Sequence, residues 1–102
     1  MENGQIKISK DVICIIADLA ISDTVDPDKV TRKLRNKGIT ITYEGEELIL
    51  GIDLIVKYGV KIPAIAESVQ KKVKASVENM TGLAVKAVNI NIIGMNFEKS
   101  EE

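Results

Sequence analysis

The sequence predicts an α+β fold, a two-layer sandwich with two main helices packed on one face of a mixed four-stranded sheet. The expected order is β-α-(short α)-β-β-α-β. Two long segments carry apolar residues at helical spacing, and several shorter ones alternate apolar and polar residues as strands do. A chain of 102 residues, 45% of them hydrophobic, can bury one core. We therefore expect a single domain over residues 1–97 and a polar, disordered tail over residues 98–102.

The first predicted elements are a short strand and a helix. Gln5–Ser9 alternates, which places Ile6 and Ile8 on one face of a strand. Ser9 is typical of a helix N-cap and opens a predicted helix over residues 10–21. Its core-facing stripe is expected to hold five apolar residues, with Ile13 at the edge: Val12, Ile15, Ile16, Leu19 and Ala20.

The opposite side of this helix is a candidate protein-contact face. It carries three apolar residues and one carboxylate at the border: Cys14, Ala17, Ile21 and Asp18. A helix that is apolar on a second side usually packs against something there. One alternative is that another part of the chain covers this face. The other is a subunit or partner contact, in which small residues let a second copy approach closely and form a homo-oligomer.

A short basic helix is predicted next. Asp26 serves as N-cap, Pro27 takes the first helical position, and Gly38 stops the helix after Lys37. Its basic residues are Lys29, Arg32, Lys33, Arg35 and Lys37. They favour either ordinary solvation and dipole complementarity or a patch for phosphate or an acidic partner. The candidate basic surface combines four of them with three lysines of a later helix: Lys29, Arg32, Lys33, Arg35, Lys71, Lys72 and Lys74.

A hairpin follows, with strands over residues 39–43 and 47–58 and a turn at Glu44–Glu46. The side of the second strand that we expect to face the core is Leu48, Leu50, Ile52, Leu54, Val56 and Tyr58. The other sheet face should be partly open and offer Asn, Thr, Asp and Lys side chains.

The second main helix has the clearest pattern in the chain. It begins near Pro63 and ends at about Met80, before the glycine stop at Gly82. Its apolar stripe is Ile62, Ile65, Ala66, Val69, Val73, Val77 and Met80. A last strand is predicted from Val85 to about Phe97, with a bulge or bend at Gly94.

The residue inventory offers little chemistry. The chain has no histidine and one cysteine, and its glycines are never clustered as a phosphate-binding loop requires. Glu44, Glu46 and Glu47 could chelate a hard cation, yet their spacing resembles no calcium loop and acidic turns are common for solvation. We expect no catalytic residue, no cofactor and no metal, and hence no enzyme.

The charge and the hydropathy constrain partners and location. A net charge of −1 argues against a protein that coats nucleic acid. No apolar run approaches the roughly 20 residues that span a bilayer, and the N-terminus is no signal peptide. We therefore expect a cytoplasmic protein with no direct membrane insertion.

The second half of the chain resembles a known family. The segments that carry the resemblance are Tyr58–Pro63, Ile65–Ala66, Val69–Val73, Val77–Leu83, Val85, Val88–Ile90 and Gly94, with Gly4–Ser9 and Asp11–Ile13 near the start. Together they resemble the alkaline shock protein family, the envelope stress response family of Gram-positive bacteria. Asp26–Asp28 and the basic segment stand where many members have a glycine-rich stretch.

The resemblance implies an abundant, non-enzymatic cytoplasmic protein. Some members are held near the membrane by a separate anchoring protein, and others are linked to control of fatty-acid synthesis. We expect a structural or scaffold protein of the cell-envelope stress response that acts through self-association and protein-partner binding. The alternative is a nucleic-acid-binding or regulatory module that uses the basic surface, although nucleic acid is not expected as the main partner.

Overall fold

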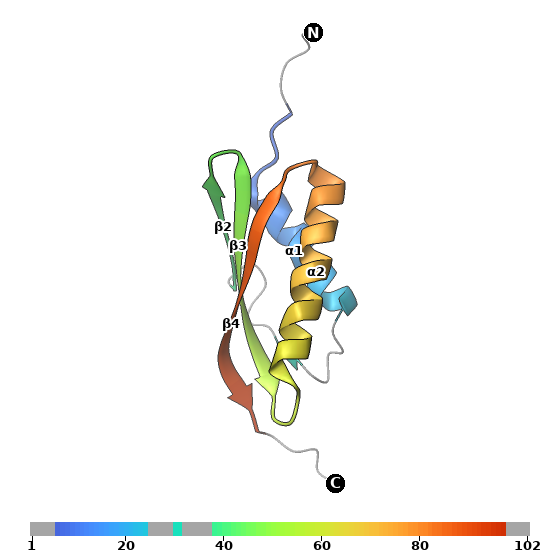
Figure 1. Ribbon diagram of the computed structural model, residues 1–102, viewed down its shortest axis with the longest axis vertical. Coiled ribbons are helices and arrows are strands. Elements are labelled where there is room, and N and C mark those ends of the chain that lie inside the picture. Colours follow the sequence, from blue (N-terminus) through green and yellow to red (C-terminus); the bar gives the residue numbers. More distant parts are fainter. Residues whose placement is uncertain (1–5, 25–29, 32–37, 98–102) are drawn as a thin grey trace.

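The computed structural model describes residues 6–24, 30–31 and 38–97. Two helices lie on one face of a mixed sheet, so the predicted α+β layers are confirmed (Figure 1). The elements are α1 Lys10–Thr24, β1 Val30–Thr31, β2 Ile39–Glu44, β3 Glu47–Lys57, α2 Ile62–Thr81 and β4 Val85–Asn96. Three of the predicted strands are present as β2, β3 and β4, but residues 6–9 do not form the predicted first strand, so the predicted set of four strands and the exact order of the elements are not matched.

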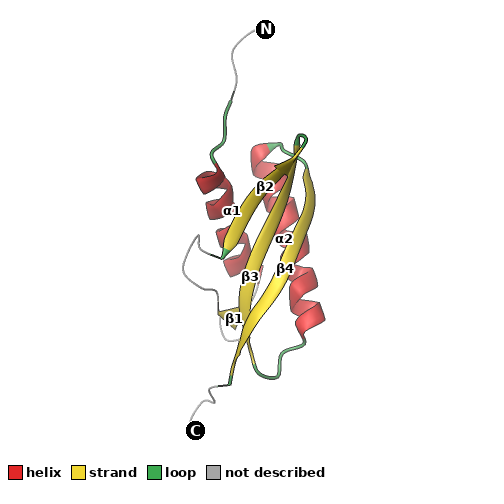
Figure 2. Cartoon of the chain, turned by 90° about the vertical axis from the view of Figure 1, so that its left-hand side faces the viewer, coloured by secondary structure: helices red, strands yellow, loops and turns green. Residues whose placement is uncertain are grey.

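The sheet is built around β3. β2 pairs with it antiparallel, with Ile39 opposite Ile52, and β4 pairs with it in parallel. The two-residue β1 is also antiparallel, with Val30 opposite Val56. Because β4 follows β3 almost from end to end, β1 and β2 share the other edge, one after the other (Figure 2).

The predicted hairpin is confirmed. Gly45 takes a positive φ of 65° in the turn, a conformation that favours glycine. Alternate residues of β3 form a fully buried row: Leu48, Leu50, Ile52, Leu54 and Val56. Tyr58 was expected to continue this row, but β3 ends at Lys57 and the Tyr58 ring is exposed.

The bulge predicted at Gly94 is also present. Leu54 pairs with Ile92 and Ile55 pairs with Gly94, so Ile93 is the extra residue of β4. The bulge returns Met95 to the side of the sheet that faces the helices, opposite Val56. β4 thereby stays paired to β3 over its whole length.

The second main helix has the predicted bounds and phase. Pro63 lies in the first turn, and Gly82 closes the helix with φ 75° while its N–H donates to the Glu78 carbonyl. The centre of the predicted stripe is buried: Val69, Val73 and Val77. Met80, at the end of the stripe, was expected to be buried and is exposed.

The first helix begins where the sequence predicts, but it is rotated about its own axis from the expected orientation, so that only Ile16 and Ala20 of the predicted core stripe are buried. The Ser9 Oγ accepts the Val12 N–H at 3.2 Å, as an N-cap does. The buried residues are Ile13, Cys14, Ile16, Ala17, Asp18, Ala20 and Ile21. Three residues of the predicted core stripe are exposed instead: Val12, Ile15 and Leu19.

The N-terminal strand and the short basic helix are not as predicted. Residues 6–9 form no strand: Ile6 is exposed, and only Ile8 packs against the core. The alternation of the two isoleucines is therefore not sufficient to form a strand here. Val30–Thr31 is the strand β1, which fills the edge of β3 left unpaired beyond Ile52. The rest of the predicted short helix and the polar tail lie outside the described residues.

Candidate functional site

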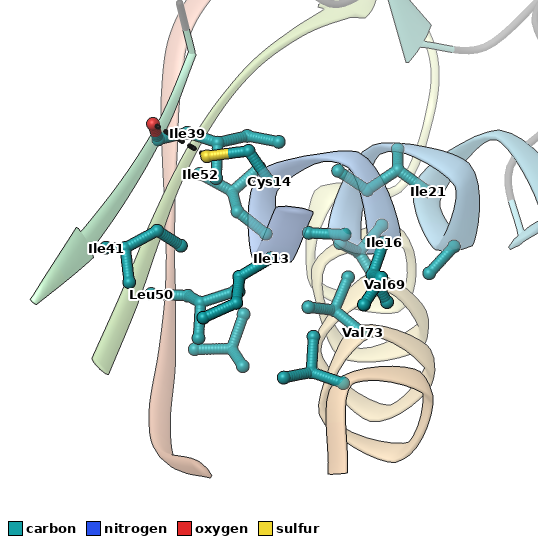
Figure 3. Packing of buried hydrophobic residues seen from close by; sticks show 14 of the residues in the cluster. Ile13, Cys14, Ile16, Ile21, Ile39, Ile41, Leu50, Ile52, Val69 and Val73 are labelled. Atoms are coloured by element: carbon teal, nitrogen blue, oxygen red, sulfur yellow. Dashed lines mark hydrogen bonds between the residues drawn. The ribbon is translucent and has the colours of Figure 1, made fainter. Parts of the chain in front are cut away.

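The predicted contact face of α1 lies in the interior. Ala17 has no exposed surface, and Cys14, Asp18 and Ile21 are also buried. The Cys14 Sγ lies 4.0 Å from the carbonyl oxygen of Ile39 on β2 (Figure 3). The small side chains do allow close packing, but the partner that packs against them is the protein's own sheet and not a second copy of the chain. Of the two alternatives for this face, the structure supports the first: the protein's own sheet covers it, so these four residues do not form an exposed contact face.

The opposite face of α1 is the exposed apolar surface. Val12 is 45% exposed, Ile15 47% and Leu19 63%, and Met80 of α2 beside them is 70% exposed. These four residues line a groove of about 330 Å³ between the two helices. The other lining residues are Ile16, Ala20, Asp23, Lys72 and Ser76. We call it the interhelix groove.

The two walls of the interhelix groove differ in composition. The α1 wall is a continuous apolar stripe with Asp23 after it, whereas the α2 wall passes from Lys72 through Ser76 to Met80. Lys72 Nζ lies 3.9 Å from Asp23 Oδ2, which joins the two walls at one point. Met80 follows Lys72 by eight residues, about 12 Å along the helix axis. The groove therefore has a charged end and an apolar end.

The single cysteine has no sign of reactivity. Burial raises the pKa of the Cys14 thiol, and the carboxylates of Asp11 and Asp18 raise it further. A thiol of raised pKa stays protonated near neutral pH and is a poor nucleophile. Among the described residues, no group of three His, Cys, Asp or Glu side chains could hold a metal ion.

The predicted basic surface is only partly within the described residues, which include Lys71, Lys72 and Lys74 of α2. Lys71 pairs with Glu67 at 3.5 Å, as i,i+4 spacing predicts, and Lys72 pairs with Asp23. The other four residues lie outside the described part: Lys29, Arg32, Lys33 and Arg35. The lysines that the structure places are thus spread along an ordinary solvated helix face, and two of the three have acidic partners.

The open face of the sheet is polar, as predicted. Thr40 and Thr42 of β2 face the same shallow hollow as Asn89 and Asn91 of β4. The Asn91 side chain donates to Asp53 Oδ1 at 3.2 Å. The residues that line the hollow include no aromatic ring, and sheets that bind single-stranded RNA stack bases on aromatic rings.

An aromatic pair at one end of the sheet was missed by sequence reasoning. The rings of Tyr58 and Phe97 lie 5.7 Å apart, and both are exposed. Each follows the last residue of a strand, β3 or β4, and these strands run parallel. The rings meet because β3 and β4 are neighbours and Lys57 is in register with Asn96, which the sequence alone does not establish.

Fold and surface together define a small α+β protein with an apolar groove between its two helices and a hollow on the open face of its sheet. None of its described helices is long and apolar enough to cross a membrane. The chain belongs to the Asp23 family, described as having a cell envelope-related function, whose model matches residues 1–97. The family name is unrelated to residue Asp23 of this chain. The predicted alkaline shock resemblance is thereby confirmed.

Three bacterial proteins are similar to the chain over most of its length. The uncharacterized protein YloU of Bacillus subtilis is 37% identical and the match covers 90% of this chain and 88% of YloU. YqhY of the same organism is 28% identical, with 97% and 83% covered. Spy1535 of Streptococcus pyogenes is 29% identical, with 95% and 83% covered. No solved structure matches the chain.

Proposed function

We propose that this protein is a non-enzymatic scaffold of the cell-envelope stress response, acting through self-association and the binding of a protein partner. Its working location would be the cytoplasm, near the membrane through that partner. The cell envelope-related description of the family supports the setting. The interhelix groove supports binding as the mode of action.

The observation that carries the proposal is the exposure of Leu19, Ile15 and Val12 beside Met80. The opposite face of α1 already supplies the core contacts, so the fold does not need these side chains to be large and apolar. Burying a large aliphatic side chain completely is worth about 1.5–3 kcal/mol. Several such side chains gathered in one groove are a typical protein-binding surface.

The nucleic-acid alternative has no comparable support among the described residues. Lys71 and Lys72 have acidic neighbours, and no aromatic residue lines the hollow on the open face of the sheet. Binding to nucleic acid would weaken steeply as salt rises, whereas an apolar protein contact would not. A salt titration with labelled single-stranded and duplex oligonucleotides therefore separates the two functions, and we expect no saturable binding at physiological salt.

Crosslinking in native cells tests the proposal. The tagged chain is compared with Leu19→Glu, which places a carboxylate in the groove, and with Ile93→Glu, an exposed apolar position on β4 outside it. We expect a crosslinked partner with wild type and Ile93→Glu and at least a fivefold smaller yield with Leu19→Glu. Mass measurement by light scattering reports self-association in parallel. A monomeric wild type without any crosslinked partner would contradict the proposed function.

A further inference from the structure

We propose that the interhelix groove receives a single amphipathic helix of a different polypeptide, rather than a second copy of this chain. The inserted helix would present apolar side chains at positions i, i+3 or i+4, and i+7. This inference rests on the proposed partner-binding function and names the chemistry of the partner. The shape, area and charge of the groove support it in turn.

The shape of the groove fits a helix. Val12, Ile15 and Leu19 stand at i, i+3 and i+7, one stripe about 10 Å long over two helical turns. Ser76 and Met80 form the facing wall. A helix of about three turns laid between the walls would contact α1 and α2 together. This is the geometry of helix-in-groove recognition, which uses apolar anchors at i, i+3 or i+4, and i+7.

The available area argues against a homodimer formed through this groove. Its four exposed apolar side chains offer roughly 400 Å², the size of an ordinary functional patch. A stable protein–protein interface takes about 800 Å² from each partner. A two-fold contact would also set the groove against its own copy, so that hollow faces hollow. A convex surface of another molecule, such as a helix, can fill the groove, whereas a second groove placed opposite would leave an empty space.

The charges limit what the inserted helix can carry. Between Val12 and Leu19 the α1 wall has no charge at the groove, so a charged residue inserted there would lose its hydration without a partner. Lys72 and Asp23 supply charges at one end only, and their exposed pair at 3.9 Å contributes little to stability. The partner helix is therefore apolar along its inserted face, and any charged residue of that face lies at the Lys72 end.

A library of displayed helical peptides tests the inference with a defined probe. Peptides of about 15 residues on an alanine- and lysine-rich scaffold, with one face randomised, are selected on the immobilised full chain. The selected sequences should carry apolar residues at i, i+3 or i+4, and i+7. By fluorescence anisotropy, Leu19→Glu should weaken binding of the selected peptides at least tenfold, and Ile93→Glu should change it less than twofold. Circular dichroism confirms that both variants fold.

Two results would overturn the inference. One is selected peptides that lack the pattern or that bind Leu19→Glu as well as wild type. The other is a wild-type dimer by light scattering that becomes monomeric in Leu19→Glu, because the groove would then hold a second copy. That second result leaves the proposed self-association standing. Conversely, helix binding as expected without any partner in native cells would support the inference and remove the proposed function.

Discussion

The two helices of this protein differ in how far the sequence determines their packing. In α2 the fully buried residues form one stripe, and charged residues such as Glu67, Lys71 and Lys74 occupy the other side. In α1 apolar residues run around the whole helix between Val12 and Ile21, interrupted only by Asp18. Periodicity therefore selects one face of α2 and offers two for α1.

Hydrophobicity alone does not explain which face of α1 is buried, because both faces carry large apolar residues, and Ile13 and Ile21 are fully buried. The inner face contains Cys14, Ala17 and Ala20, whereas Ile15 and Leu19 lie outside. Small residues let α1 come close to the hairpin, as the 4.0 Å contact between Cys14 and Ile39 illustrates. The predicted stripe contained Val12, Ile15 and Leu19 in place of small residues of the buried face, and this gave the wrong orientation. The large side chains that remain exposed, such as Ile15 and Leu19, line the interhelix groove.

The largest expected effect is on α2, where the phase is unambiguous. Val69→Asp would bury a carboxylate at a position without exposed surface and should reduce the free energy of unfolding by about 3–5 kcal/mol. Ser68→Asp adds the same charge at the adjacent exposed position and should change it by less than about 0.5 kcal/mol. Urea denaturation of both variants measures the difference. Equal stabilities would show that Val69 does not face the core.

A matched pair of variants on α1 tests which face of this helix is buried, because the sequence alone predicts the wrong face. Ala17→Arg places a long cation in the core and should cost about 3 kcal/mol or more. Leu19→Arg, two residues on, lies on the exposed face and should stay within about 1 kcal/mol of wild type. Sequence analysis alone predicts the reverse, with Ala17→Arg leaving the fold intact and shifting the protein toward monomer. Thermal melts followed by circular dichroism decide between the two orientations.

Local sequence signals predicted the structure correctly where a residue type has one common structural role. Ser9, Pro63 and Gly82 mark helix ends, and the alternation through β3 marks its buried side. Local signals did not predict the structure of segments whose conformation depends on strand pairing in the folded protein. Val30–Thr31 pairs with the part of the β3 edge that β2 leaves unpaired, and Ile6 lies outside the sheet although its alternation with Ile8 is typical of a strand. Met80 fits the α2 stripe, but it lies across from α1 in the interhelix groove, where it is exposed and belongs to the candidate site.

A smaller effect is expected at the end of α2. Gly82 has φ 75°, so Gly82→Ala should cost about 1 kcal/mol through backbone strain even though its Cβ would meet no atom within 4 Å. Gly94→Ala is the control, because its Cβ would meet Ile55 Cγ1 at an ordinary 3.7 Å and φ is not positive. Chemical denaturation measures both. A Gly94→Ala loss larger than that of Gly82→Ala would mean that the β4 bulge, and not the helix stop, is the sensitive position.

The smallest effect concerns the buried side of α1 at high pH. Burial, followed by Asp11 and Asp18, raises the pKa of the Cys14 thiol above its ordinary value of about 9. The unfolded chain therefore releases this proton first as the pH rises, and folded-state stability from Cys14 is complete below pH 9 and declines above it.

Cys14→Ala lacks the titrating group and should lack this decline. The measured quantity is the difference in unfolding free energy between wild type and variant, which removes the contributions that both proteins share. We expect that difference to be constant from pH 7 to 8.5 and then to move against wild type up to pH 10.5. A constant difference over the whole range would place the thiol in contact with water, and α1 would then have to be turned back toward the orientation that periodicity alone suggests.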